Sequence, residues 1–434
     1  MLVDLIRVPE PTCIDDMLDE PFGLLMLGAS LEKAGYEVRI TNLAGCDYES
    51  WKSKIKPADM YGIQLNTPTA PLGIKIAEYI KQKYPGTPVI CGGSHVSAIE
   101  DFCELMVFDT IVMGEGDREI VDLATEHGAG IQLRKFVCAR HIGDLDTLPF
   151  PARNLVDMDA FHRKVDGKRC FGIIGSRGCC FKCAFCDRTL FGEKIRYRSI
   201  DNIVAEIKHI IKEYGVRNFE MFDDMFTFHK GRVREFVEKT KGLKISYRCN
   251  SRSDMLDPSI YRMLRDSGCK MICFGIESGS QRLLNAMSKG TTVERNHKAI
   301  SIARQAGITT AGYFILGFPG ETKETINETK EFILRSGIDH AQVYTFIPLP
   351  GCDVYRNPSK YGMKIISKDY SDYYLVTGND GRGGKIIETE HLSADELQEE
   401  VVKFRQFLKE YGSRGEVQDY YKDKLKYKDR NAAK

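Results

Sequence analysis

The chain has 434 residues, 28% of them charged and 42% hydrophobic, with a formal net charge of +1, so it is long enough for two or three domains and is no general nucleic-acid binder. Residues 1–7 do not resemble a secretory signal, and no apolar run is long enough to span a bilayer. The 14 cysteines are scattered rather than spaced as a disulfide framework, which is typical of a reducing compartment, and we therefore expect a cytoplasmic protein.

Residues 1–140 alternate between strand-like and helix-like segments. The predicted strands cover 2–8, 36–41, 60–65, 88–91 and 110–113, and the predicted helices cover 21–34 and 71–83. Strands that alternate with helices indicate right-handed crossovers and a doubly wound parallel sheet, here a Rossmann-like α/β domain.

Small and polar residues follow three of these strands. Ligands of doubly wound sheets bind at the carboxyl ends of the strands, and small residues there let the backbone approach a flat, bulky ligand. The residues expected to bind a cofactor at this edge are Thr67, Gly92, Gly93, Ser94, His95, Gly114, Glu115 and Gly116.

A linker, residues 141–166, separates this domain from a second alternating region. Pro149 and Pro151 prevent a helix in the linker. In residues 167–365 we predict strands at 172–176, 218–222, 246–251, 271–276, 310–316 and 342–346, and helices at 201–214, 230–240, 258–267, 295–306 and 323–336. This count suits a partial (β/α)6 barrel, whose chemistry gathers at the carboxyl ends of the strands.

Three cysteines, Cys179, Cys183 and Cys186, lie close together after the first of these strands. Three thiolates so closely spaced can hold three irons of a four-iron four-sulfur cluster and leave the fourth iron open for a substrate or cosubstrate. A structural zinc site is the alternative, but it usually needs a second pair of ligands. The adjacent Cys180 cannot easily join the same tetrahedral site, and we expect it to pack beside the loop.

The C-x3-C-x2-C spacing, with Phe185 before the last cysteine, resembles the signature of the radical S-adenosylmethionine (SAM) superfamily. In that superfamily SAM chelates the open iron, and an electron from the reduced cluster cleaves SAM to a 5′-deoxyadenosyl radical. The resemblance implies that Cys179, Cys183 and Cys186 are metal ligands and catalytic residues, and that Phe185 packs against adenine.

Later barrel strands end in residues that resemble SAM-binding segments of the superfamily. Asp223 and Asp224 point to opposite faces of a strand, so only one of them, expected to be Asp224, can meet the SAM amino group. Glu277 is implied as an acceptor for the ribose or amine, and Gly317 as part of the backbone beside adenine. An ordinary strand-end turn is the alternative for each segment. The expected SAM-binding residues are Phe185, Asp224, Ser251, Arg252, Glu277, Ile315 and Gly317.

The order of the N-terminal strand ends resembles the cobalamin-binding domain of cobalamin-dependent radical SAM enzymes. The resemblance implies that residues 1–140 bind cobalamin. The D-x-H-x-x-G motif, which supplies an axial histidine in other cobalamin proteins, is absent, and residues 41–46 read Thr-Asn-Leu-Ala-Gly-Cys instead. We therefore expect no histidine from this domain on cobalt, and interpret His95 as a hydrogen-bonding or packing residue.

Residues 366–434 are expected to form a mainly helical C-terminal segment. Ser393 is a helix cap with Glu396 three residues on, and the helix should run to about Tyr411. In the family such a segment covers the barrel mouth and contacts the substrate. A glycine-rich turn at 378–384 precedes this helix, and the lysine-rich tail from 420 to 434 is expected to be solvated.

These resemblances imply a cobalamin-dependent radical SAM enzyme with a [4Fe-4S] cluster, SAM and cobalamin as cofactors. We expect a methyltransferase for an unactivated carbon or phosphorus centre of a small-molecule or lipid-like substrate, with a peptide as an alternative. A reductant such as flavodoxin or ferredoxin is the expected partner. Relatives that cyclise or rearrange a ring without methyl transfer are the alternative within the family.

A radical SAM methylthiotransferase, acting on RNA or protein, is the alternative from another branch. Cys13, Cys46 and Cys91 lie roughly where those enzymes carry three cysteines for an auxiliary cluster. Their surroundings do not match, since Cys91 ends a strand as buried cysteines often do. The C-terminus also lacks the short strands of an RNA-binding β-barrel.

Overall fold

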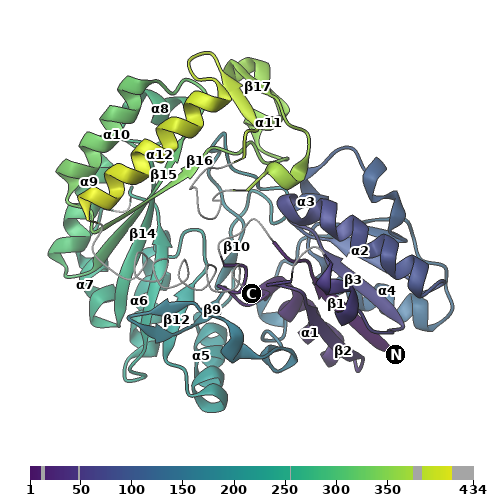
Figure 1. The fold of residues 1–434 in the computed structure, drawn as a ribbon. Coiled ribbons are helices and arrows are strands. Elements are labelled where there is room, and N and C mark those ends of the chain that lie inside the picture. The colour runs from purple at the N-terminus through teal and green to yellow at the C-terminus, as the bar shows by residue number, and fades with distance from the viewer. Residues whose placement is uncertain (11–14, 47–48, 255, 375–383, 413–434) are drawn as a thin grey trace, which may run out of the picture.

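The structure is a computed structural model that describes residues 1–10, 15–46, 49–254, 256–374 and 384–412 (Figure 1). Two six-stranded parallel sheets dominate the described ranges, with strand orders β2-β1-β3-β4-β5-β6 and β16-β15-β14-β13-β12-β9. The predicted α/β fold class is confirmed. The glycine-rich turn around 378–383, Cys13 and the lysine-rich tail lie outside the described residues.

The N-terminal sheet is covered on both faces because its strands alternate between two apolar cores. Leu5 of β1 belongs to a core with Leu24 and Leu123, from helices on one face, whereas its neighbour Ile6 belongs to a core with Ile76 on the other. The strands are β1 Leu2–Arg7, β2 Glu37–Asn42, β3 Met60–Gln64, β4 Val89–Gly92, β5 Thr110–Met113 and β6 Phe136–Cys138. The helices are α1 Phe22–Lys33, α2 Ala70–Lys83, α3 Ser94–Ala98 and α4 Gly116–Gly128.

The second sheet curves into the predicted partial barrel, and every strand pair within it is parallel. One large apolar core lies between its strands and its helices, with Phe219, Phe274 and Phe314 fully buried. The strands are β9 Phe171–Ile173, β12 Asn218–Met221, β13 Ser246–Ser251, β14 Cys269–Glu277, β15 Thr309–Leu316 and β16 His340–Thr345. The helices are α5 Ile200–Tyr214, α6 Lys230–Thr240, α7 Pro258–Asp266, α8 Gln281–Ala286, α9 Val293–Gln305, α10 Lys323–Ser336 and α11 Asp353–Arg356.

Short elements complete the described chain. Three two-stranded sheets pair β7 Lys164–Val165 with β8 Lys168–Arg169, β10 Ser176–Arg177 with β11 Arg196–Tyr197, and β17 Met363–Ile365 with β18 Ile387–Thr389. The 3-10 turns are η1 Ser50–Lys54, η2 Thr67–Thr69, η3 Cys103–Val107, η4 Leu145–Thr147, η5 Arg153–Leu155, η6 Met158–Ala160, η7 Pro358–Tyr361 and η8 Tyr370–Asp372.

The C-terminal helix α12, Ala394–Tyr411, begins at Ser393, whose side chain forms the predicted capping box with Glu396. Its apolar stripe, which includes Leu397 and Phe404, is buried in the outer core of the barrel beside α10 and β16 (Figure 1). An amphipathic helix buries its apolar stripe, and Leu397 near the start of this helix lies against Gly317, at the carboxyl end of β15. That the C-terminal segment covers the barrel mouth stays a prediction. Within the described ranges, no helix is both long and apolar enough to cross a membrane.

Candidate functional site

The three cysteines lie in one loop, residues 178–195, whose ends are joined by the pairing of β10 with β11. Cys179, Cys183 and Cys186 are all partly exposed. The loop is folded by backbone contacts: the amide of Cys186 donates to the carbonyl of Cys183 at 3.2 Å, and the amide of Cys179 to the carbonyl of Gly192 at 3.4 Å. Three accessible thiols in one ordered loop are the donor set that a four-iron cluster with one open iron requires.

The electrostatic surroundings of the loop disfavour free thiolates. Burial and the neighbouring Cys183 and Asp224 raise the pKa of Cys186 to about 12, and burial raises that of Cys179. Coordination to iron stabilises the thiolate form, which this environment otherwise disfavours. In the part of the chain described here, no three Cys, His, Asp or Glu side chains are placed to share one metal ion.

Arg252 and Lys289 connect the cysteine loop to the ends of two barrel strands. The guanidinium of Arg252 lies 3.7 Å from the ring centroid of Phe181 and 3.8 Å from the sulfur of Cys183. It also donates to the carbonyl of Lys289, whose ammonium forms a buried ion pair with Glu277 at 2.6 Å and lies 5.8 Å from the ring centroid of Phe185. Three of the predicted SAM-binding residues therefore lie around Lys289, which was not predicted from the sequence: Arg252, Glu277 and Phe185.

Glu277 has an unusual backbone conformation. Its φ is +66°, in the left-handed region that residues other than glycine seldom adopt, at a register shift between β14 and β15. Such a conformation costs free energy and persists where the surroundings fix it. The carboxylate is held by the buried ion pair with Lys289.

The two aspartates have different environments, although both lie beyond the end of β12, so the strand alternation from which the difference was predicted does not apply to them. Asp223 is buried and accepts hydrogen bonds from the Ser176 hydroxyl and, at 2.9 Å, from the amide of Gly175. Asp224 is solvent accessible but lies among dense protein atoms, and this desolvation, together with the charge of Asp223, raises its pKa to about 6. Asp224 is therefore the one of the two that a ligand can reach.

The remaining predicted SAM-binding residues are less open. The hydroxyl of Ser251 is buried and shares a 2.6 Å hydrogen bond with Thr227. Ile315 is partly buried. Gly317 has a φ of +87° and lies against Leu397 of α12, and its amide donates to the buried Glu321 at 3.2 Å. That Ser251 binds SAM, and that Ile315 and Gly317 lie beside adenine, stays a prediction.

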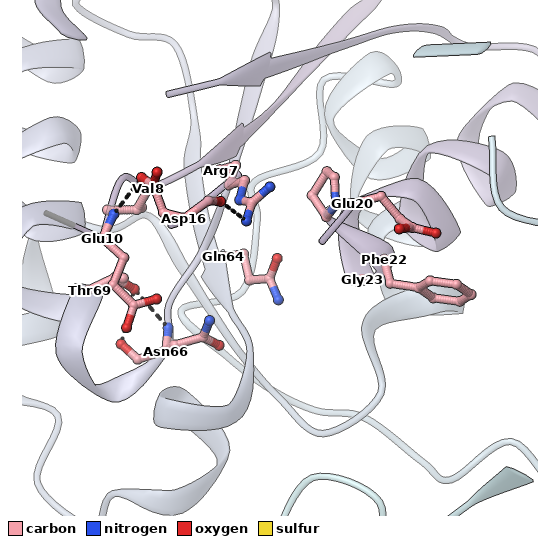
Figure 2. Close-up of a pocket in the computed structure, with 11 residues that line it drawn as sticks. Arg7, Val8, Glu10, Asp16, Glu20, Phe22, Gly23, Gln64, Asn66 and Thr69 are labelled. Atoms are coloured by element: carbon pink, nitrogen blue, oxygen red, sulfur yellow. Dashed lines mark hydrogen bonds between the residues drawn. The ribbon is translucent and has the colours of Figure 1, made fainter. Parts of the chain in front are cut away.

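A pocket of about 250 Å³ lies at the carboxyl ends of β1 and β3 and at the start of α1 (Figure 2). Here the strand order reverses direction, which is where doubly wound sheets bind ligands. Polar side chains dominate the wall. In the view, Gln64 stands between Glu10 and Asp16 on one side and Glu20 and Phe22 on the other. The lining residues are Arg7, Val8, Glu10, Asp16, Glu20, Pro21, Phe22, Gly23, Gln64, Asn66 and Thr69.

The residues predicted to bind cobalamin lie next to this pocket rather than in its wall. Ser94 donates to the side-chain oxygen of Asn66 at 3.1 Å, and Gly93 (φ +117°) packs against the backbone of Leu65. Gly92, Gly114 and Gly116 occupy strand ends or helix starts along the same edge, and Thr67 is buried in η2.

His95 and Glu115 are engaged by protein groups. His95 is 2% exposed, with Nδ1 3.4 Å from the Thr67 hydroxyl and its ring 4.6 Å from the ring of Tyr370, which agrees with a packing role. The carboxylate of Glu115 binds Arg177, Arg196 and His141, and a cobalamin contact at this strand end stays a prediction. A buried carboxylate needs such partners because desolvation alone is costly.

Two family models match the chain. The Radical SAM superfamily matches residues 173–333, and the B12 binding domain matches residues 19–124. The first range contains the cysteine loop and most of the barrel strands, and the second contains α1 and the ends of β3, β4 and β5.

Three known proteins are similar to this chain over most of its length. The uncharacterized methyltransferase PH0819 of Pyrococcus horikoshii is 30% identical over 76% of this chain and 76% of its own length. An anaerobic magnesium-protoporphyrin IX monomethyl ester cyclase of Rubrivivax gelatinosus is 26% identical over 82% of this chain and 66% of its own length. The structure of the radical SAM methyltransferase TsrM from Kitasatospora setae has the same fold, with a TM-score of 0.67, 17% identity and coverage of 92% and 84% of the two chains.

The chain belongs to the cobalamin-dependent radical SAM enzymes. The recognition made from the cysteine spacing and the glycine-ended strands is thereby confirmed, as is the predicted cofactor set of a [4Fe-4S] cluster, SAM and cobalamin.

Proposed function

We propose that the chain is a methyltransferase that acts on a carbon or phosphorus centre of a small-molecule substrate. The observation that carries the proposal is the position of the cysteine loop, held by Arg252 against the barrel strand ends and by Arg177 against the N-terminal domain. Relatives named as methyltransferases support it. Besides the Pyrococcus protein, a cytidylyl-2-hydroxyethylphosphonate methyltransferase of Streptomyces wedmorensis is 29% identical over 51% of this chain.

Cys179, Cys183 and Cys186 would hold the cluster, and the N-terminal domain would hold cobalamin beside the pocket of Figure 2. When bound, the cluster supplies the electron that cleaves SAM reductively, and cobalamin supplies the methyl carrier. The chain itself contributes orientation and exclusion of water. A reductant such as flavodoxin or ferredoxin would deliver the electron.

The strand ends would orient SAM through groups of opposite charge. Asp224 presents an accessible carboxylate for an amine, and the ion pair of Lys289 with Glu277 presents both a cation and an acceptor beside the loop. Because a misplacement of about 1 Å can cost a hundredfold in rate, residues that fix these side chains matter as much as those that touch SAM.

Ring closure without methyl transfer is the second candidate, because two magnesium-protoporphyrin IX monomethyl ester cyclases are 26% and 27% identical over 82% of this chain. A methylthiotransferase is disfavoured by the core of the N-terminal domain. Cys46 and Cys91 are both buried there among apolar side chains, and burial strongly raises the pKa of Cys91, so both behave as packing residues.

One experiment separates these functions. The anaerobically reconstituted protein, with cobalamin and a chemical reductant, is given SAM with a deuterated methyl group and a small-molecule extract. Methyl transfer should give a product that gains the label, with S-adenosylhomocysteine and 5′-deoxyadenosine in similar amounts. Accumulation of 5′-deoxyadenosine with an altered but unlabelled product would replace the methyltransferase proposal with the cyclase.

The cluster assignment has a matched control in the same loop. Changing Cys179, Cys183 and Cys186 together to alanine should reduce about four irons per chain to none and abolish SAM cleavage. Cys180 is exposed and adjacent, so Cys180→Ala should retain the iron and the cleavage. A triple variant that kept its four irons would exclude these ligands.

A further inference from the structure

Glu115 and Asp117 form a buried ion network with the two arginines at the base of the cysteine loop. Arg177 Nη1 lies 2.8 Å from a carboxylate oxygen of each acid, and Arg177 Nη2 lies 3.0 Å from the second oxygen of Asp117. Arg196 binds the other oxygen of Glu115 at 2.5 Å. Glu115, Asp117 and Arg177 are only 2%, 5% and 8% exposed, so the network is shielded from water.

The two arginines are placed where they can control the loop. Arg177 and Arg196 are paired residues of β10 and β11, so they flank the loop 178–195 at its two ends. Arg196 also donates to the carbonyls of Ile142, at 2.6 Å, and of Phe191, at 3.0 Å, the second of which belongs to the loop itself. Each end of the loop is therefore fastened to Glu115 by a charged hydrogen bond.

A second connection passes through His141. Its Nδ1 lies 2.9 Å from Glu115, and its Nε2 lies so close to Gly192 that a methyl group on that glycine would be 2.9 Å away. Gly192 in turn accepts the hydrogen bond from the amide of Cys179. Glu115 is thus connected to Cys179 through His141 and Gly192.

Glu115 itself lies in the N-terminal domain. It follows β5 and precedes α4, and neighbouring Gly114 is held by a 2.9 Å hydrogen bond from its amide to the Ser97 hydroxyl, just beyond the glycine-rich end of β4. Burial by itself would raise the pKa of Glu115, but hydrogen bonds from Arg196, Arg177 and His141 outweigh it and hold the pKa below its usual value. The acid is therefore charged at neutral pH.

We propose that Glu115 and Asp117 are positioning residues that clamp the cysteine loop to the cobalamin-binding domain, so that loading of the cluster and binding of cobalamin strengthen each other. The inference rests on the proposed function only for the identity of the two cofactors. Because coupling between two sites is reciprocal, either cofactor should tighten the other by the same factor.

The test measures binding rather than turnover. The dissociation constant of hydroxocobalamin is determined anaerobically for the full chain with its cluster reconstituted and for the same protein stripped of iron by a chelator. In the wild type, the cluster should tighten cobalamin binding about tenfold, a typical size for such coupling. In Glu115→Gln, Arg196 loses this carboxylate and Arg177 keeps only Asp117, so the ratio of the dissociation constant without the cluster to that with the cluster should fall well below its wild-type value.

Asp4→Asn is the matched control. Asp4 is a fully buried carboxylate of the same domain that accepts hydrogen bonds from Arg39 and Thr41, but it does not contact the cysteine loop. This variant should keep the wild-type ratio. If Glu115→Gln does not fold, Arg196→Met leaves Arg177 on Glu115 and should lower the ratio partway.

A wild-type ratio of one, or a ratio that Glu115→Gln preserves, would overturn the clamp. Loss of the ratio in Asp4→Asn as well would also overturn it, because general destabilisation would then explain the effect. Wild-type protein that binds no hydroxocobalamin would refute both the clamp and the proposed function, whereas normal coupling without methyl transfer would refute only the function. Iron retained on dilution, with and without hydroxocobalamin, gives the reciprocal measurement.

Discussion

His95 should make the N-terminal domain sensitive to mild acid. Burial lowers its pKa from 6.5 to about 4, and the facing groups, the Thr67 hydroxyl and the Tyr370 ring, carry no charge that would offset this. As the pH falls, the unfolded chain therefore takes up a proton before the folded chain does. Above pH 6.5 the histidine is neutral in both states and does not lower the free energy of unfolding. Between pH 6.5 and about 4 the free energy of unfolding falls progressively, because only the unfolded chain is protonated there.

The size of the effect follows from the two pKa values. Their difference of about 2.5 corresponds to about 3 kcal/mol when protonation is complete, at 1.36 kcal/mol per pKa unit. At pH 5 the unfolded histidine is almost fully protonated and the folded one almost neutral, so about 2 kcal/mol should already be lost.

Urea unfolding at pH 7.5 and pH 5, followed by tryptophan fluorescence, measures this loss. Trp51 is the only tryptophan, and it is buried in the same apolar core as Val96, next to His95. The wild type should lose about 2 kcal/mol more than His95→Gln between the two pH values. Equal losses would refute the burial argument. Electron paramagnetic resonance of bound cob(II)alamin should be unchanged in the variant, and a nitrogen splitting lost with His95 would instead identify it as a cobalt ligand.

Two stability predictions concern the barrel. Gly317→Ala should cost about 2–4 kcal/mol in urea unfolding, because its φ is +87° and a methyl group would lie 2.6 Å from a side chain of α12, whereas Gly215→Ala, at φ +66° in open space, should cost only about 1–2 kcal/mol. Glu206→Ala should cost about 3–5 kcal/mol, because it leaves Arg153, 1% exposed, without its carboxylate, and Glu213→Ala on the exposed side of the same helix should stay within about 0.5 kcal/mol. Equal costs within either pair would contradict the reasoning.

Regular elements with strong periodicity could be predicted from the sequence. The predicted bounds of β5, α6, β13 and α10 agree with the structure to the residue. In β5, α6 and α10 buried residues are bounded on both sides by polar or glycine residues. The short β6 was missed because its apolar run, Phe136–Cys138, has only three residues, fewer than a strand pattern needs. The pairs β10/β11 and β17/β18 are too short for a periodicity of two to be visible.

Site residues that lie close together in the sequence could be predicted, whereas contacts between residues far apart in the sequence could not. Cys179, Cys183 and Cys186 are detectable because cluster ligands recur at a fixed spacing within one loop. Lys289 lies 12 residues from Glu277, and Arg177 lies 62 residues from Glu115. Neither separation belongs to a recognisable sequence pattern, so neither ion pair could be predicted. In the sequence, only the glycines on both sides of Glu115 marked that residue as part of the site. We predicted from them that Glu115 contacts cobalamin, and its contacts with Arg177 and Arg196 were not predicted.

The boundary between the two sheets is fixed by charge at two places. Besides the clamp at Glu115, Asp19 before α1 binds Arg163 at 2.7 Å, Arg163 lies 3.4 Å from the buried Glu220 of β12, and Glu220 pairs with Arg248 of β13 at 2.6 Å. An apolar boundary can slide without much change in free energy, whereas charged hydrogen bonds with little access to water are lost when partners shift by an ångström or two. A reaction that passes from one cofactor to a substrate beside another needs that kind of boundary, since both cofactors must hold one geometry through the transfer. We therefore infer that the arginine and carboxylate pairs at the boundary fix its geometry, and that their loss will lower the coupling between the cofactors.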